Sequence, residues 1–191
     1  MSHGAAGSVL ALLKLYQACG DEAFLALAQR GLEFERSLFD PVEKGWPDLR
    51  GEKPVRDPVQ WCHGAAGIGF ARMAALDVLD DPAIRDEIET AIAAVLATQD
   101  GGRDNLCCGH AGRFSMLRYA LELGCGPDDL EHRFNHRLSA WINRLDNPNT
   151  IGLMARDKVF QTGLMQGLPG IGQALLEIAA PEKIRPVLTL E

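Results

Sequence analysis

Three cysteines that precede glycine-rich turns carry the clearest chemistry in this sequence. Cys62 stands two residues before Gly64, and Cys107 and Cys108 directly precede Gly109. Each glycine opens a G-x-x-G segment that leads into an apolar helical run, so the thiols are expected at helix N-termini. There the helix dipole and free N–H groups favour the ionised thiol. Three thiolates supply three of the four ligands of a tetrahedral zinc site with one open position.

The charge of such a site predicts its use. Three thiolates around one Zn²⁺ leave a net charge of −1, so a further thiolate in the open position would be electron-rich and weakly held. That favours activation of a nucleophile over Lewis-acid chemistry. We therefore predict zinc ligation by Cys62, Cys107 and Cys108, with His110 as the reserve ligand if one thiol points away.

Other cysteines and histidines have simpler interpretations. A single cysteine at a helix start is more often a small buried hydrophobe, and Cys19 and Cys125 lie at breaks without partners, so we interpret both as structural. His63 is interpreted as a capping or supporting group. His132 and His136 share an i, i+4 spacing, but no carboxylate motif accompanies them, which favours a solvated helix face.

The composition excludes several classes of protein. The 191 residues are 47% hydrophobic and 24% charged, which suits one soluble domain. A formal charge of −7 argues against nucleic-acid binding, which depends on clustered Lys and Arg. No apolar run approaches a membrane span, and no export signal is visible. We expect a cytoplasmic protein with reduced thiols.

Apolar residues at a spacing of three and four predict helices throughout the chain. The expected helices cover residues 9–18, 21–38, 61–79, 81–98, 109–123, 128–145 and 167–180. Residues 45–58 and 146–163 are expected to be loops. No strand-like alternation competes, so the predicted fold class is all-α.

The glycine motif recurs along the chain. Gly4, Gly64, Gly109 and Gly167 each start a helix, at intervals of 45 to 60 residues, and the first three of these helices are each followed by a more polar one. This pattern predicts a helical-hairpin repeat in which neighbours stack to bury the first helix of each pair. Glycine lets each helix start pack closely against its neighbour. Four such repeats would form a partial ring or arc.

Several separate motifs resemble those of the lanthionine synthetase C family, and most closely the C-terminal cyclase of class II lanthipeptide synthetases. They are the His-Gly-x-x-Gly repeats, Trp-Cys-x-Gly at residues 61–64, Cys-Cys-Gly at 107–109, the segments 37–40 and 46–49, and the closing residues 187–191. Most members have Cys-His-Gly at the later motif. A subset of class II enzymes with broad substrate tolerance shares the Cys-Cys-Gly form, in which all three protein ligands are thiolates.

The resemblance implies an α/α toroid of seven inner and seven outer helices around a zinc site. With about four repeats, residues 1–191 are expected to be the C-terminal part of such a cyclase domain, a partial toroid. The implied reaction is the addition of a peptide cysteine thiolate to the β-carbon of dehydroalanine or dehydrobutyrine in a dehydrated precursor peptide. It closes a lanthionine or methyllanthionine thioether ring.

The resemblance also assigns residues to proton transfer. His3 occupies the position of the family histidine given acid–base work, for which imidazole is suited near neutral pH. The family places an arginine shortly before Trp-Cys; the fourth residue before Cys62 is Pro58 here, and Arg56 is only the nearest candidate. A family aspartate from an earlier repeat has no counterpart.

Other functions stay open at this point. The small number of repeats allows a truncated, non-catalytic zinc-containing module that binds a peptide or partner protein. A toroidal hydrolase with paired carboxylates is a weaker interpretation, because the loop acids Asp48, Asp57 and Asp104 form no defensible pair. The apolar edges of a partial ring predict self-association or a complex with the remaining N-terminal half. The isolated chain is accordingly expected to be an enzyme that depends on such a partner for full activity.

Overall fold

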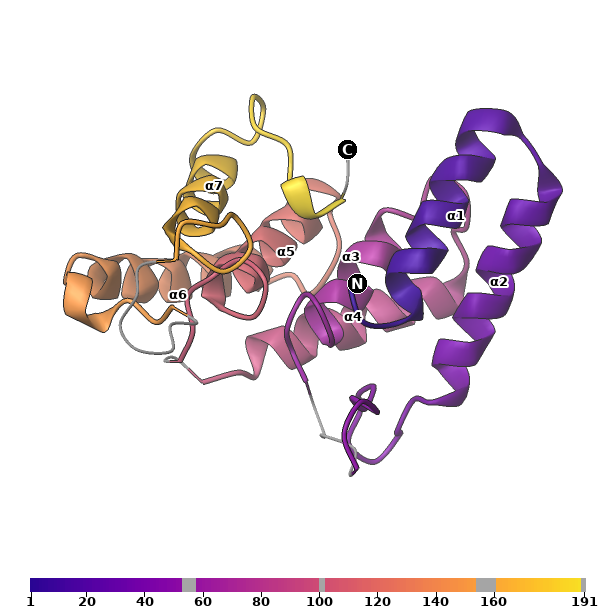
Figure 1. Cartoon of the computed structure of the whole chain (residues 1–191), viewed down its shortest axis with the longest axis horizontal. Helices are drawn as coiled ribbons and strands as arrows, with labels where there is room; N and C mark the ends of the chain where they lie inside the picture. The colour runs from indigo at the N-terminus through magenta and orange to yellow at the C-terminus, as the bar shows by residue number, and fades with distance from the viewer. Residues whose placement is uncertain (53–57, 100–101, 154–160, 190–191) are drawn as a thin grey trace. The chain divides into compact units, whose positions relative to one another are not determined.

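Helices and loops make up the whole of the described chain. The computed structural model describes residues 1–52, 58–99, 102–153 and 161–189 (Figure 1). These residues contain seven α-helices, two short 3-10 helices and two isolated β-bridges, but no strand. The predicted all-α fold class is confirmed. None of the described helices combines the length and the apolar character that a membrane crossing requires.

The chain divides into two units, Met1–Val95 and Leu96–Glu191. The helices of the first unit are α1 (Ala5–Cys19), α2 (Glu22–Ser37), α3 (Ala65–Met73) and α4 (Pro82–Leu96), the last of which ends at the boundary. The second unit contains α5 (His110–Glu122), α6 (Leu130–Leu145), η1 (Pro148–Thr150), α7 (Leu168–Ala179) and η2 (Val187–Thr189).

Burial is far greater in α3 and α5, the first helices of the second and third hairpins, than in α2 and α6. All nine residues of α3 are buried, as are nine of the 13 in α5, whereas α2 and α6 each bury only three of 16. Within each unit the first helices of successive hairpins also contact each other, α1 with α3 and α5 with α7. These contacts agree with the predicted stacking of hairpin repeats, in which the apolar first helices supply the core.

One predicted helix ends early. The apolar pattern predicted a helix as far as residue 79, but α3 ends at Met73 and residues 74–78 form successive turns. The N–H groups of Ala75 and Leu76 donate to carbonyls three residues back, at Arg72 and Met73. The pattern of burial continues through Ala75 although the α-helical hydrogen bonding does not, so hydrophobic periodicity alone could not locate the end.

Three seven-residue loops of one design precede the buried helices α3, α5 and α7. We call these segments, residues 58–64, 103–109 and 161–167, the glycine loops. In each, the carbonyl of the first loop residue accepts a hydrogen bond from the first helical N–H: Pro58 from Ala65 at 2.9 Å, Arg103 from His110 at 2.9 Å and Gln161 from Leu168 at 3.3 Å. This backbone bond caps a helix whose N-cap glycine has no side chain to do so.

Close backbone approach requires the glycine at the end of each loop. A Cβ on Gly64 would lie 2.1 Å from the carbonyl oxygen of Pro58, and the corresponding distances to the first loop residue are 2.5 Å for Gly109 and 2.0 Å for Gly167. Any side chain would force the loop open. The close approach that these glycines permit is therefore between the two ends of one loop, whereas the sequence predicted it between a helix start and its neighbour.

Candidate metal centre

The glycine loops place the candidate ligands at matching positions. Counting from the first loop residue, Cys62 and Cys107 are both fifth, and His63 and Cys108 are both sixth. In the third loop these positions hold Met165 and Gln166. The first two loops thus each present two adjacent donors of the kind that zinc prefers, sulfur or imidazole nitrogen.

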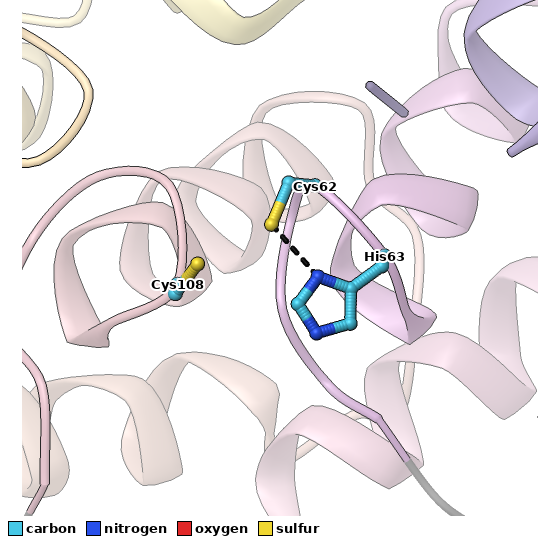
Figure 2. A group of neighbouring side chains, drawn as sticks. All are labelled: Cys62, His63 and Cys108. Atoms are coloured by element: carbon cyan, nitrogen blue, oxygen red, sulfur yellow. Dashed lines mark hydrogen bonds between the residues drawn. The ribbon is translucent and has the colours of Figure 1, made fainter. Parts of the chain in front are cut away.

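In the first unit, Cys62 and His63 are in direct contact. The Cys62 Sγ lies 2.9 Å from Nδ1 of His63, and the two groups point toward each other (Figure 2). Cys62 is buried, while the His63 side chain is partly exposed. The imidazole can therefore share a proton with the thiol and still reach solvent through its other nitrogen.

The far side of the His63 ring faces an ion pair. Nε2 of His63 lies 3.9 Å from Oδ2 of Asp48. Arg50 donates to both carboxylate oxygens of Asp48, from Nε at 2.8 Å and from Nη2 at 2.6 Å. These hydrogen bonds lower the pKa of Asp48 to about 2, so the carboxylate stays charged beside the imidazole at neutral pH.

His3 lies close to this group. Its backbone N–H donates to the carbonyl of Cys62 at 3.1 Å, and its ring centroid is 6.2 Å from that of His63. His3 is exposed, and together with His63 and Asp48 it lines a cavity of about 260 Å³ in the first unit. The predicted acid–base histidine is thus accessible to a ligand and adjacent to Cys62.

In the second unit, Cys107 and Cys108 present their sulfurs together. The two Sγ atoms are 3.3 Å apart. The Cys107 N–H donates to the carbonyl of Met165 at 2.8 Å, and the Cys108 N–H donates to Oδ1 of Asn105 at 2.7 Å. Because both backbone amides are bound, the position of the thiol pair is set by the second and third glycine loops together.

A buried carboxylate holds the second glycine loop. Asp104 is fully buried and accepts hydrogen bonds from Nε1 of Trp141 at 2.7 Å and from the N–H of Gly152 at 2.6 Å. Arg144 contributes an ion pair and donates a further bond at 2.9 Å. A buried charge is stable only when it is paired in this way. The contacts tie the loop that carries the thiols to α6 and to the segment after η1.

The remaining candidates lie in other surroundings. His110, the predicted reserve ligand, is buried at the start of α5 with its ring against Phe114 and Trp141, each centroid 6.2 Å away. Cys19 is exposed at the end of α1, and Cys125 lies in the turn after α5. His132 and His136 are exposed on α6. Arg56 and Asp57 lie outside the described residues.

The donor set fits zinc. Two thiolates at tetrahedral positions, each about 2.3 Å from the ion, lie about 3.8 Å apart, so the 3.3 Å separation of the Cys107 and Cys108 sulfurs requires little adjustment. Cys62, His63 and Cys108, the side chains drawn in Figure 2, each offer an atom that can bind a metal ion. Cys107 adds a second thiol beside Cys108.

Sequence reasoning did not anticipate the contacts of His63. It was interpreted as a capping or supporting group, which its hydrogen bond to the Cys62 thiol agrees with, but neither that bond nor the Asp48–Arg50 ion pair on the far side of the ring was predicted. A signal was present in the alignment of the glycine loops, because His63 occupies the same position as the candidate ligand Cys108.

Comparison with known proteins identifies the family. No curated protein matches the sequence. The sequence model of the family described as lanthionine synthetase C-like protein matches residues 1–190, nearly the whole chain. The motifs that resembled this family, the all-α hairpin repeats and the sulfur and imidazole donors before the buried helices agree with that match. The chain belongs to the lanthionine synthetase C-like family.

Proposed function

We propose that this protein is a zinc-dependent lanthipeptide cyclase domain, which joins peptide cysteines to dehydroalanine or dehydrobutyrine through thioether bonds. Membership of the family supports a cyclase. The observation that carries the proposal to this chain is the placement of sulfur and imidazole donors at matching positions of two glycine loops.

Cys62, Cys107 and Cys108 would hold the zinc ion, with His63 beside Cys62 as the alternative donor. When bound, zinc lowers the pKa of a substrate thiol so that the thiolate is present at neutral pH. The burial of Cys62 and the backbone bonds of Cys107 and Cys108 hold these side chains in place before the substrate arrives.

His3 would donate the proton that the α-carbon gains. The thiolate forms a bond to the β-carbon of the dehydrated residue, and the electrons of the C=C bond move onto the α-carbon and its carbonyl as an enolate. Protonation at the α-carbon completes the addition, and an imidazolium is a suitable donor near neutral pH. The proton lost by the substrate thiol balances the one gained at carbon. His3 is exposed in the cavity beside Cys62, where it can meet a bound peptide.

Paired loop carboxylates receive no support as a catalytic alternative. Asp48 is bound by Arg50, and Asp104 is buried and paired with Arg144. A carboxylate held by a guanidinium is a poor proton acceptor because the ion pair stabilises its charged form. Within the described part of the chain, these two acids serve to hold loops.

The test combines metal analysis with ring closure. The purified protein should contain zinc, and a Cys107→Ala, Cys108→Ala double variant should lose it. With a dehydrated peptide that contains one cysteine, the wild type should convert the free thiol to thioether faster than buffer does, measured by loss of the alkylation mass shift. The His3→Ala variant should keep zinc and close rings about 100-fold more slowly or worse, in the range of a lost general acid.

Each outcome has a distinct meaning. Metal-free wild-type protein, or unchanged zinc in the double variant, would contradict the metal assignment. Zinc without any acceleration of ring closure would instead identify the non-catalytic peptide-binding module.

A further inference from the structure

The cavity beside His3 has an apolar wall that proton transfer does not use. Its volume of about 260 Å³ lies within the first unit, between the start of α1, the end of α2 and the loop that follows α2. An apolar cavity of about 150 Å³ already accommodates benzene. The space therefore suits an apolar amino-acid side chain with its adjoining backbone.

Two apolar side chains at this cavity are more than half exposed. Phe34 on α2 is 57% exposed and Leu49 is 51% exposed, and both line the cavity. Apolar surface in water is unfavourable in proportion to its area. A ligand that covers these side chains gains binding energy from surface that the fold itself leaves open.

The first part of the loop that forms the wall is held by contacts of its own. Trp46 is buried and meets the Phe39 ring edge to face, with centroids 5.0 Å apart. Asp40 and Gly45 exchange backbone hydrogen bonds at 2.9 and 3.3 Å, which closes the turn ahead of Trp46. Preformed walls of this kind are typical of ligand pockets, because little ordering entropy is lost on binding.

Polar side chains also line the cavity, among them Glu35, the Asp48–Arg50 ion pair and two histidines beside the proposed zinc ligand Cys62. The histidines are His3 and His63, and each contacts Cys62, His3 through its backbone and His63 through its ring. A peptide whose cysteine reaches Cys62 therefore brings its neighbouring residues to the cavity.

We propose that this cavity is a subsite for an apolar side chain next to the reacting cysteine of the peptide substrate. The proposal rests on the proposed function, since it assumes a peptide cysteine at Cys62. It makes Phe34 and Leu49 specificity-determining residues, which bind the substrate without taking part in the addition.

The test uses the full chain and two fluorescein-labelled hexapeptides. One contains Leu-Cys-Leu and the other Gly-Cys-Gly in an otherwise identical sequence, and neither contains a dehydrated residue, so no ring can close. Fluorescence anisotropy should show the Leu peptide bound about tenfold more tightly, as expected for burial of one leucine side chain. Phe34→Ala should abolish this preference. Leu27→Ala is the matched control, because Leu27 is 46% exposed on the same helix but does not line the cavity.

A second pair of variants fills the cavity instead of widening it. Ala5→Leu at the start of α1 places a larger side chain in the cavity, whereas Ala11→Leu makes the same change on an exposed position of that helix. The first should remove the preference for the Leu peptide and the second should keep it. Equal binding of both peptides by the wild type, or a preference that survives both Phe34→Ala and Ala5→Leu, would overturn the proposal.

Ring closure with dehydrated versions of the same peptides separates the two proposals. If rings close but neither peptide is preferred, the subsite is wrong and the cyclase assignment stands. If no ring closes while the preference still depends on Phe34, the cavity is a peptide site and the cyclase assignment fails.

Discussion

His63 and Cys107 are both candidates for the remaining ligand of the proposed zinc site. Both adjoin a thiol of the predicted site, His63 beside Cys62 and Cys107 beside Cys108, and both donor types suit zinc. The Sγ to Nδ1 distance of 2.9 Å is that of a hydrogen bond. Two donors on one tetrahedral zinc would lie farther apart than this pair, and farther apart than the two sulfurs. We propose Cys107 as the ligand and His63 as the hydrogen-bond partner of Cys62, because Cys107 and Cys108 form the Cys-Cys-Gly motif.

Metal affinity should therefore respond differently to the two residues. We expect Cys107→Ser to weaken zinc binding by more than 100-fold, because a ligand is lost, and His63→Gln by no more than about tenfold, the lower range for a supporting group. Competition with a chromophoric chelator measures both. The reverse order would place the imidazole among the ligands and remove Cys107 from them.

Asp48 and Arg50 form an ion pair next to His63. Hydrogen bonds from Arg50 lower the pKa of Asp48 to about 2 in the folded protein, below about 3.9 for a free aspartate. The lowered pKa means that the pair stabilises the fold above pH 4, and that this stabilisation is lost as the pH falls toward 2.

Removal of the guanidinium should reverse this shift. In Arg50→Gln the pKa of Asp48, followed by carbon NMR of its carboxyl group, should rise toward its ordinary value. The melting temperature should fall relative to wild type at pH 6, and the difference should shrink as the pH is lowered to 2. An unchanged carboxyl titration would contradict the assignment of Arg50 as the cause.

At the scale of elements, the glycine loop explains why glycine recurs before the buried helices. The clash is with backbone, which cannot move aside as a side chain can. A Cβ at Gly64 meets the Pro58 carbonyl, whereas a Cβ at Gly4, the N-cap of α1, meets nothing within 4 Å.

Gly64→Ala and Gly4→Ala thus form a matched pair. Gly64→Ala should lower the free energy of unfolding by about 2 kcal/mol or more, in the range of overpacked sites. Gly4→Ala should change it by less than about 0.5 kcal/mol, as at open surface sites. Urea denaturation followed by circular dichroism measures both, and equal effects would show that the backbone contact does not hold the loop.

Asp104 also holds a glycine loop in place, but it does so through its side chain. Removing one partner of a buried ion pair costs about 3–5 kcal/mol. We expect Asp104→Ala to destabilise the protein by an amount in that range and to speed the reaction of Cys107 and Cys108 with a thiol reagent. Asp128→Ala, at an exposed aspartate before α6, is the control and should change neither property. If Cys107 and Cys108 react at the wild-type rate in Asp104→Ala, the contacts of Asp104 do not hold the loop that carries these cysteines.

The sequence was sufficient to predict most elements but not their contacts. Capping and breaking residues such as Asp21, Gly20 and Pro82 marked the starts and ends of helices closely, because they act on the local backbone. The end of α3 was missed because buried turns continue its apolar pattern. The Asp104 network links residues up to 48 positions apart, and such pairs depend on packing that one sequence does not reveal.

At the scale of the whole molecule, the first hairpin leaves two leucine side chains nearly half exposed. The first helix α1 buries only four of its 15 residues, and Leu15 on α1 and Leu27 on α2 are 47% and 46% exposed. The corresponding helix α3 is buried throughout. The first helix α1 therefore leaves apolar surface open to solvent that α3 does not.

We therefore expect self-association at micromolar concentration. Sedimentation velocity should show species larger than the 20.8 kDa chain, and Leu15→Glu should shift the population toward monomer because it replaces an exposed apolar side chain with a charge. A monodisperse wild-type monomer would contradict this prediction.

In the glycine loops, the residues that fix the backbone shape are different from the residues that supply the chemistry. The hydrogen bonds that close each loop run between backbone atoms, and the strict steric demand falls on its last residue. The fifth and sixth positions can therefore change identity while the loop persists, as Cys-His, Cys-Cys and Met-Gln already do within this one chain. Point mutations at these two positions can therefore replace one metal donor with another while the backbone of the loop is kept. Substituting Cys or His for Met165 and Gln166 would therefore give the third glycine loop a pair of metal donors as well.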